Sequence, residues 1–161
     1  MNRRRITALV MFHAVVLMLA VGGGVANAGS QVGEPRFNAR MSGDQEVPVA
    51  DPDGAGGARF ELKLGRGQLC FKMQFHKTGT PNRGHIHVGA AGENGAIVVP
   101  LFELVGDPTN PWNDRLENRH LEGCVAADEA ILNEIAANPE GFYCNLHNAR
   151  FPAGAIRGQL T

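Results

Sequence analysis

The most restrictive feature of this 161-residue chain is the alternation of apolar and polar side chains over residues 58–76. Apolar side chains occupy every second position over residues 58–64 and again over residues 69–76. A period of two places successive side chains on opposite faces of a β-strand. Gly65-Arg66-Gly67 separates the two runs and has the composition of a hairpin turn. The pattern therefore predicts two antiparallel strands with one face in a core and the other in water.

Five further segments have the composition of short strands and are bounded by turn residues. They are residues 37–41, 84–88, 96–102, 142–147 and 155–160. Over residues 128–138 the apolar spacing becomes helical, with Asp128 placed to cap the helix and Pro139 to end it. Together these elements predict an all-β fold: an antiparallel immunoglobulin-like β-sandwich of about seven or eight strands with one short helix.

The N-terminus has the three parts of an export signal. Arginines at positions 3–5 precede an apolar run over residues 6–21, and Ala26-Asn27-Ala28 follows. A signal peptidase recognises this order of a basic region, an apolar region and small residues before the cut. The apolar run is shorter than the roughly 20 residues that a helix needs to cross a bilayer. We predict a cleaved signal peptide over residues 1–28 and a secreted, periplasmic or extracellular protein, with an uncleaved anchor as the alternative.

The chain that follows the predicted cut has the size of one domain, at 161 − 28 = 133 residues. It keeps 15 − 3 = 12 of the basic residues and all 16 acidic ones. A mildly acidic chain without a basic run lacks the electrostatic footprint of a nucleic-acid-binding protein. We predict a flexible lead-in over residues 29–36, a monomeric domain over residues 37–161, and no membrane span after cleavage.

The chain has three cysteines, and all of them follow the predicted leader. In an oxidising compartment, a pair is expected to be bridged and the third cysteine to be left over. Cys70 and Cys124 both lie in strand-like sequence, so we favour the disulfide Cys70–Cys124, with Cys144 as a small buried apolar residue. The pairing Cys70–Cys144 is the alternative, since the sequence leaves the connectivity open.

His85-Ile86-His87 is the motif with the clearest chemical potential. In a strand, residues i and i+2 share a face and lie about 6.6 Å apart along the chain. Two imidazoles at this separation can converge on one zinc or copper ion. The alternative, which we favour, is a hydrogen-bonded histidine cluster that braces loops. The sequence contains no nucleophile-elbow serine and no phosphate-binding loop, which weighs against an enzyme.

Arg157 follows apolar neighbours near the end of a predicted strand. A guanidinium in such a place usually needs a carboxylate partner. Our candidate is Glu46, and we expect a structural ion pair between Glu46 and Arg157 that ties the first strand to the last.

Four motifs, in the family's order, resemble the chordin (CHRD) domain family and together span almost all of the sequence after the leader. They are Met41-Ser42-Gly43-Asp44-Gln45-Glu46-Val47-Pro48; Gly84-His85-Ile86-His87-Val88-Gly89 with Gly92-Glu93-Asn94-Gly95; Tyr143-Cys144-Asn145-Leu146-His147-Asn148; and Phe151-Pro152-Ala153-Gly154-Ala155-Ile156-Arg157-Gly158-Gln159-Leu160. Cys144 and Asn148 depart from this pattern, since the family usually has valine and threonine at these places.

The resemblance implies a β-sandwich that is similar to the Cu/Zn superoxide dismutase fold. The family includes bacterial secreted proteins and chordin, which binds bone morphogenetic proteins outside the cell, while the domain's own activity is largely unassigned. The resemblance also implies that His147 is a third metal-ligand candidate beside His85 and His87. Dismutase activity is not expected, because the dismutase site uses more histidines and an aspartate.

We therefore predict an exported CHRD-domain module that binds or supports other molecules without catalysis, with an extracellular protein or polysaccharide as its partner. Such a module predicts an exposed apolar patch, for which the region around Trp112 is the candidate. The alternative is a metalloprotein in which His85, His87 and His147 hold copper or zinc for binding, storage or redox chemistry.

Overall fold

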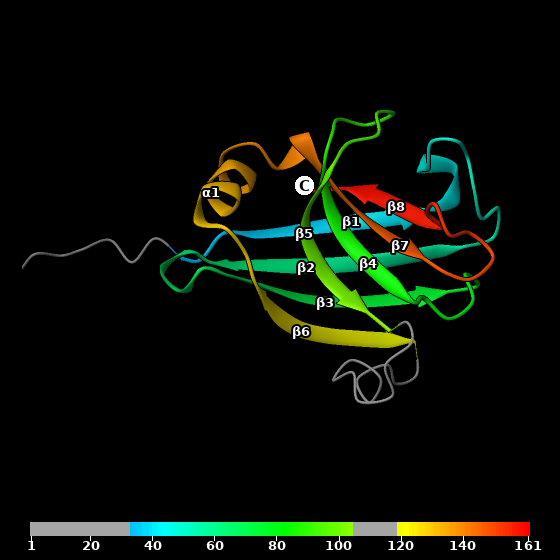
Figure 1. Cartoon of the computed structure of the whole chain (residues 1–161), viewed down its shortest axis with the longest axis horizontal. Helices are drawn as coiled ribbons and strands as arrows, with labels where there is room; N and C mark the ends of the chain where they lie inside the picture. Colours follow the sequence, from blue (N-terminus) through cyan, green and yellow to red (C-terminus); the bar gives the residue numbers. More distant parts are fainter. Residues whose placement is uncertain (1–32, 105–118) are drawn as a thin grey trace, which may run out of the picture. The chain divides into compact units, whose positions relative to one another are not determined.

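The structure is a computed structural model that describes residues 33–104 and 119–161 (Figure 1). The predicted signal peptide and Trp112 lie outside these residues. The described part contains eight β-strands and the helix α1 (Glu129–Ala137). The strands are β1 (Arg36–Ser42), β2 (Ala55–Lys63), β3 (Gln68–His76), β4 (Arg83–Val88), β5 (Ile97–Glu103), β6 (His120–Ala126), β7 (Phe142–His147) and β8 (Ile156–Gln159).

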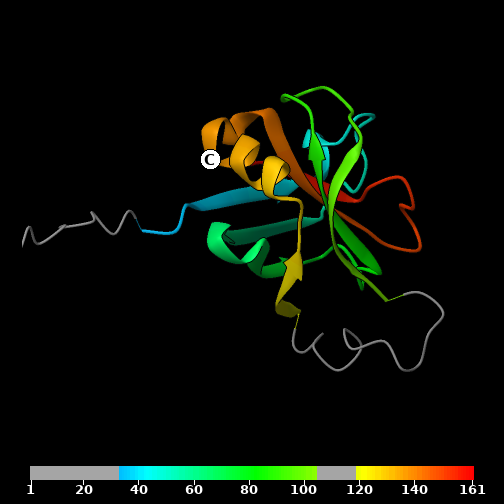
Figure 2. The ribbon, with the colours of Figure 1, turned by 60° about the vertical axis from the view of Figure 1, so that its left-hand side comes forward.

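The strands form one antiparallel sheet in the order β5-β4-β7-β8-β1-β2-β3-β6. This sheet folds over on itself, so that β4, β5 and β7 cross over β1, β2 and β3 (Figures 1 and 2). The two layers are joined where β8 meets β1, through the pair Ser42–Arg157 and the bridge Ala39–Leu160. The predicted all-β sandwich with one helix is confirmed.

The alternation that dominates the sequence forms the hairpin β2–β3 and the centre of the core. Phe60 on β2 pairs with Phe71 on β3, and Leu62 pairs with Leu69. All four side chains are buried. At the turn, Gly67 adopts a left-handed conformation with φ of 58°, which glycine accommodates without steric cost. The period-two pattern was a sufficient predictor here because strand pairing and turn are both local in sequence.

Helix α1 begins at its predicted cap. The carboxylate of Asp128 accepts the backbone N–H of Ala130 at 2.8 Å and that of Ile131 at 3.3 Å. Leu132 and Ile135 are fully buried against the core. No helix in the described part of the chain is long and apolar enough to cross a membrane.

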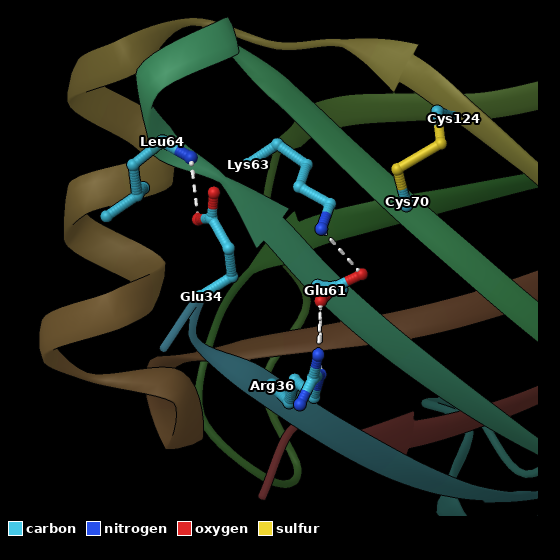
Figure 3. Close-up of polar contacts among 7 residues, drawn as sticks. All are labelled: Glu34, Arg36, Glu61, Lys63, Leu64, Cys70 and Cys124. Carbon is cyan, nitrogen blue, oxygen red and sulfur yellow. Dashed lines mark hydrogen bonds and ion pairs between the residues drawn. A yellow bond between two sulfur atoms is a disulfide. The ribbon is translucent and has the colours of Figure 1, made fainter. Parts of the chain in front are cut away.

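The end of the predicted lead-in, residues 29–36, contacts the hairpin. Arg36, the first residue of β1, places its Nη2 atom 2.6 Å from Oε1 of Glu61 on β2 (Figure 3). Glu34 accepts the backbone N–H of Leu64 at 3.2 Å. Residues 34–36 therefore contact β2 and the turn that follows it.

The disulfide joins Cys70 on β3 to Cys124 on β6, two residues that lie directly opposite each other in the sheet (Figure 3). It fastens the edge strand β6 to β3, its only neighbour among the described strands. Cys144 is free and fully buried among the core residues. The favoured pairing is confirmed, and the alternative Cys70–Cys144 is wrong.

Replacing Cys70 and Cys124 together with alanine should lower the free energy of unfolding by about 2–4 kcal/mol, because the unfolded chain regains the entropy of an open loop. Denaturant unfolding followed by circular dichroism measures this loss. Thiol titration of the unfolded, unreduced parent is the control and should find one reactive thiol, that of Cys144. Finding three would contradict the disulfide.

Candidate functional site

The outer face of strands β4, β7 and β8 is polar. Ile86, Cys144 and Leu146 point into the core, so their neighbours along the strands point to the opposite face. We call this set the polar layer. It consists of Arg83, His85 and His87 of β4; Tyr143, Asn145 and His147 of β7; and Arg157 and Gln159 of β8.

Most of the polar layer is buried, although it lies on the outside of the sheet. Its least exposed members are Arg157 (1%), Tyr143 (3%), Asn145 (3%), His147 (7%) and His87 (9%). Buried polar groups are costly unless they find partners. The contacts that this layer makes therefore decide what the site can do.

Two loops cover the polar layer with backbone carbonyl groups. In the loop after β4, the carbonyl oxygen of Gly95 contacts His87, and that of Gly89 accepts an N–H from Gln159 at 2.6 Å. In the loop after β7, the carbonyl oxygen of Pro152 accepts an N–H from Arg83 at 2.8 Å. The covering loops thus present acceptors, which suit the donors of the layer beneath them.

The three histidines singled out from the sequence converge within this layer. One ring nitrogen from each of His85, His87 and His147 lies within 4.8 Å of the other two. Nδ1 of His85 is 3.1 Å from Nε2 of His147. The ring centroids of His85 and His87 are 5.6 Å apart. Adjacent strands β4 and β7 thus bring together histidines that are 62 residues apart in sequence.

The carbonyl contacts determine which ring nitrogens carry a proton. A carbonyl oxygen can only accept, so His87 Nδ1 donates to Gly95 at 2.9 Å and His147 Nδ1 donates to Pro152 at 3.1 Å. In the neutral form of each ring, Nε2 then carries the lone pair. That of His147 accepts from Nδ1 of His85, whereas that of His87 is buried and has no hydrogen-bond partner among the described residues.

The environment keeps two of the histidines neutral. Burial lowers the pKa of His85 to about 4, and electrostatic interactions with His147, His87 and Arg83 lower it further. Burial also lowers the pKa of His147 to about 4, against the opposing effect of its hydrogen bond to Pro152. Neutral imidazole is the form that binds metal ions, so these rings are ready to act as ligands at neutral pH.

Tyr143 links the histidines to Arg157, and sequence reasoning missed it. Its ring stacks on His87 with centroids 4.9 Å apart and planes 7° from parallel. The Arg157 guanidinium carbon lies 3.9 Å from the centroid of the same ring. The available signal was the alternation in β7, which places Tyr143 on the same face as Asn145 and His147.

The polar contacts of Arg157 differ from the predicted ion pair. Its guanidinium donates to Asn94 at 3.2 Å and to the carbonyl oxygen of Ala90 at 3.4 Å, while no ion pair with Glu46 occurs in the described part of the chain. Burial raises the pKa of Glu46 to about 7, and the charge of Arg157 only partly offsets this. The loop after β4 and the Tyr143 ring occupy the guanidinium, so the carboxyl interacts with it at longer range.

Glu46 packs instead against Gly154. A Cβ atom at position 154 would lie 2.7 Å from Glu46 Oε1, and the backbone there has φ of 147°. Only glycine combines that conformation with the close approach of a carboxyl group. Glu46 Oε1 is itself buried and has no hydrogen-bond partner among the residues that the structure describes.

These features define the class of the protein as an antiparallel β-sandwich domain that carries a histidine cluster in a buried polar layer. The family model for the CHRD domain matches residues 37–160, and the chain belongs to the CHRD domain family. A comparison with curated proteins found no match, and a comparison with solved structures found none either.

Replacing Glu46 with glutamine should change how the melting temperature depends on pH. Because folding raises the pKa of Glu46 from 4.5 to about 7, the folded state holds this proton more tightly than the unfolded state. Glu46 therefore supports the fold at low pH, and this contribution is lost as pH rises through about 7. Glu46→Gln lacks this titration, so its melting temperature relative to the parent should rise between about pH 5 and about pH 8.

Glu134→Gln is the matched control, since Glu134 is exposed on α1. Its melting temperature relative to the parent should be the same at both pH values. If the melting temperature of Glu46→Gln also differed from that of the parent by the same amount at both pH values, the pKa of Glu46 would not be raised by folding.

Proposed function

We propose that this chain is an exported CHRD-domain protein that binds one zinc or copper ion through His85, His87 and His147. The observation that carries the proposal is the Nε2 atom of His87, which is a metal-binding atom in neutral imidazole. It is buried, unpartnered in the described structure, and held in place by the hydrogen bond on the other side of the ring. A ligand histidine typically donates its far N–H to a backbone carbonyl in this way.

The competing interpretation is a cluster that only braces the loops. Such a cluster gains by pairing every polar atom, because a buried acceptor without a partner costs about 1–3 kcal/mol. Two of the three rings fit either interpretation, since His85 and His147 bond to each other. The His87 ring favours metal binding, because a bound cation would use its free lone pair.

The chemistry of the donor set suits zinc and copper. Imidazole binds both ions, and three histidines leave at least one coordination position for another group. The three rings come from adjacent strands, so the sheet fixes their spacing. A bound ion would supply Lewis-acid chemistry in the case of zinc and electron transfer in the case of copper.

Export fits this proposal. The predicted signal peptide over residues 1–28 would send the chain to a compartment in which disulfides persist. The disulfide Cys70–Cys124 supports such a location. We therefore place the metal-binding domain outside the cytoplasm.

A second candidate function is the binding of an extracellular protein or polysaccharide. Val49 is 69% exposed and Val47 is 38% exposed in the loop after β1. This loop is joined to the loop after β4, because Asn94 donates an N–H to the carbonyl oxygen of Val47 at 2.7 Å. Apolar side chains on a fixed loop are suited to contact with a partner. This function is compatible with metal binding in the same domain.

Elemental analysis of residues 29–161 after loading with zinc or copper should find close to one ion per chain. The double variant His85→Ala/His87→Ala should lose about 100-fold or more in affinity, because losing ligands costs more than the roughly 10–100-fold typical of an outer partner. Isothermal titration calorimetry measures the affinities. The control is His76→Ala/His120→Ala, which changes two exposed histidines and should bind like the parent.

The absence of bound metal in the parent after loading would refute this function. Equal metal content in the parent and the His85→Ala/His87→Ala variant would place the ion elsewhere. In either case, the search for function would move to partners of the loop that carries Val47 and Val49.

Expression of the full chain in a bacterial host should yield an exported protein whose N-terminal residue is Gly29. The expectation follows from the small residues Ala26 and Ala28 before the predicted cut. N-terminal sequencing of the exported fraction tests it. Replacing Ala26 and Ala28 with bulky leucine should block cleavage, and a full-length protein retained with the cells in the parent itself would contradict the signal peptide.

A further inference from the structure

Asn145 is a second member of the polar layer with an unused acceptor. Its side chain is buried, with a residue exposure of 3%. Its Oδ1 atom has no hydrogen-bond partner among the described residues. Buried amide oxygens are nearly always satisfied, so an unpaired one indicates a missing partner such as a water or an ion.

The register of the strands places Asn145 among the histidines. It lies directly opposite His85 on the neighbouring strand β4. Residues that face each other in this way have Cβ atoms about 4.5–5.5 Å apart. Asn145 is also two residues from His147, so both side chains are on the same face of β7. His87 lies diagonally across from it, opposite Tyr143.

The structure thus assembles two unsatisfied buried acceptors, His87 Nε2 and Asn145 Oδ1, in one small layer. A hydrogen-bonded bridge between them would need a donor, and each of these atoms presents a lone pair. A cation accepts lone pairs from both atoms at once. Arg83 donates from Nη2 to Pro152 and Arg157 donates to Asn94 and Ala90, while Nε of Arg83 is buried and has no hydrogen-bond partner among the described residues.

We propose that the carboxamide oxygen of Asn145 is the fourth ligand of the metal site and makes it selective for a divalent ion. This inference rests on the proposed three-histidine site. Three imidazole nitrogens and one amide oxygen would supply four nitrogen and oxygen donors, and zinc sites are commonly four-coordinate with such atoms. Divalent copper also takes nitrogen and oxygen ligands, whereas monovalent copper prefers soft sulfur donors and gains little from an amide oxygen.

A ligand role and a structural role of Asn145 predict different metal profiles. If Asn145 is a ligand, Asn145→Leu keeps the branching and the number of side-chain heavy atoms and removes the oxygen. Zn²⁺ affinity should then fall about 100-fold or more, beyond the range typical of an outer partner, while Cu⁺ affinity should stay within a few-fold of the parent. If Asn145 only supports the fold, the affinities for both ions should fall together. Asn145→Asp retains an oxygen and should bind Zn²⁺ at least as tightly as the parent.

The experiment uses residues 29–161 without metal, titrated with Zn²⁺ in competition with a chromophoric chelator and with Cu⁺ under anaerobic, reducing conditions that leave the disulfide intact. Asn133→Leu, an exposed asparagine on α1, is the matched control and should bind both ions like the parent. Thermal unfolding of the metal-free variants shows that each is folded. Asn145→Leu should unfold at or above the parent temperature, because it removes an unpaired buried acceptor.

The outcomes separate this inference from the proposed function. A parent that binds neither ion would refute the site as a whole. A parent that binds Zn²⁺ while Asn145→Leu binds it equally well would refute only the role of Asn145, and so would an equal loss of Zn²⁺ and Cu⁺. Should Asn145→Leu fail to fold, weaker Zn²⁺ binding by folded Asn145→Asp than by the parent would overturn the proposal.

Discussion

The hydrogen bond from His87 Nδ1 to the carbonyl oxygen of Gly95 has consequences for both the fold and the site. It holds the loop after β4 over the sheet and fixes the proton on one side of the imidazole. In the same loop, the side-chain oxygen of Asn94 and the carbonyl oxygen of Ala90 accept N–H groups from Arg157. The N–H of Gly95 donates to the Tyr143 hydroxyl at 3.3 Å. A Cβ atom at position 95 would overlap the carbonyl group of Val88, so the loop can approach this closely only with glycine there. The buried polar layer therefore depends on the backbone groups of this loop, together with the Pro152 carbonyl group in the loop after β7.

The sandwich supports this arrangement from beneath. Strands β4, β7 and β8 lie side by side, and their core-facing residues are apolar. The opposite faces of the same strands carry the histidines, Tyr143 and Arg157. Packing of the core thus sets the register, and the register sets which polar groups meet. Three of the four sequence motifs that resemble the CHRD family supply these strands and the covering loops, and the first motif supplies the loop after β1, where Val47 accepts an N–H from Asn94.

Local patterns in the sequence predicted the local features well. The β2–β3 hairpin, the capped helix and the shared face of His85 and His87 all follow from spacing within a few residues. Features that depend on residues far apart in the sequence were harder to predict. The burial of His87 depends on a loop, and the meeting of Asn145 with His85 depends on strand register. Arg157 was expected to pair with Glu46, yet an aromatic ring and two loop acceptors were available to it. The sequence does not show which of these partners Arg157 will meet, because that depends on how the loops fold over the sheet.

The unpaired Cys144 shows that neighbouring residues of one strand can lie in very different environments. Cys144 lies between Tyr143 and Asn145 in sequence, yet its side chain is on the core side of β7. Burial raises its pKa, so the nucleophilic thiolate is suppressed. It is therefore screened both from oxidants and from the histidines. A solution of this domain can be kept without any reducing agent, which spares the Cys70–Cys124 bridge, and a preparation left in air should stay free of cross-linked pairs of chains.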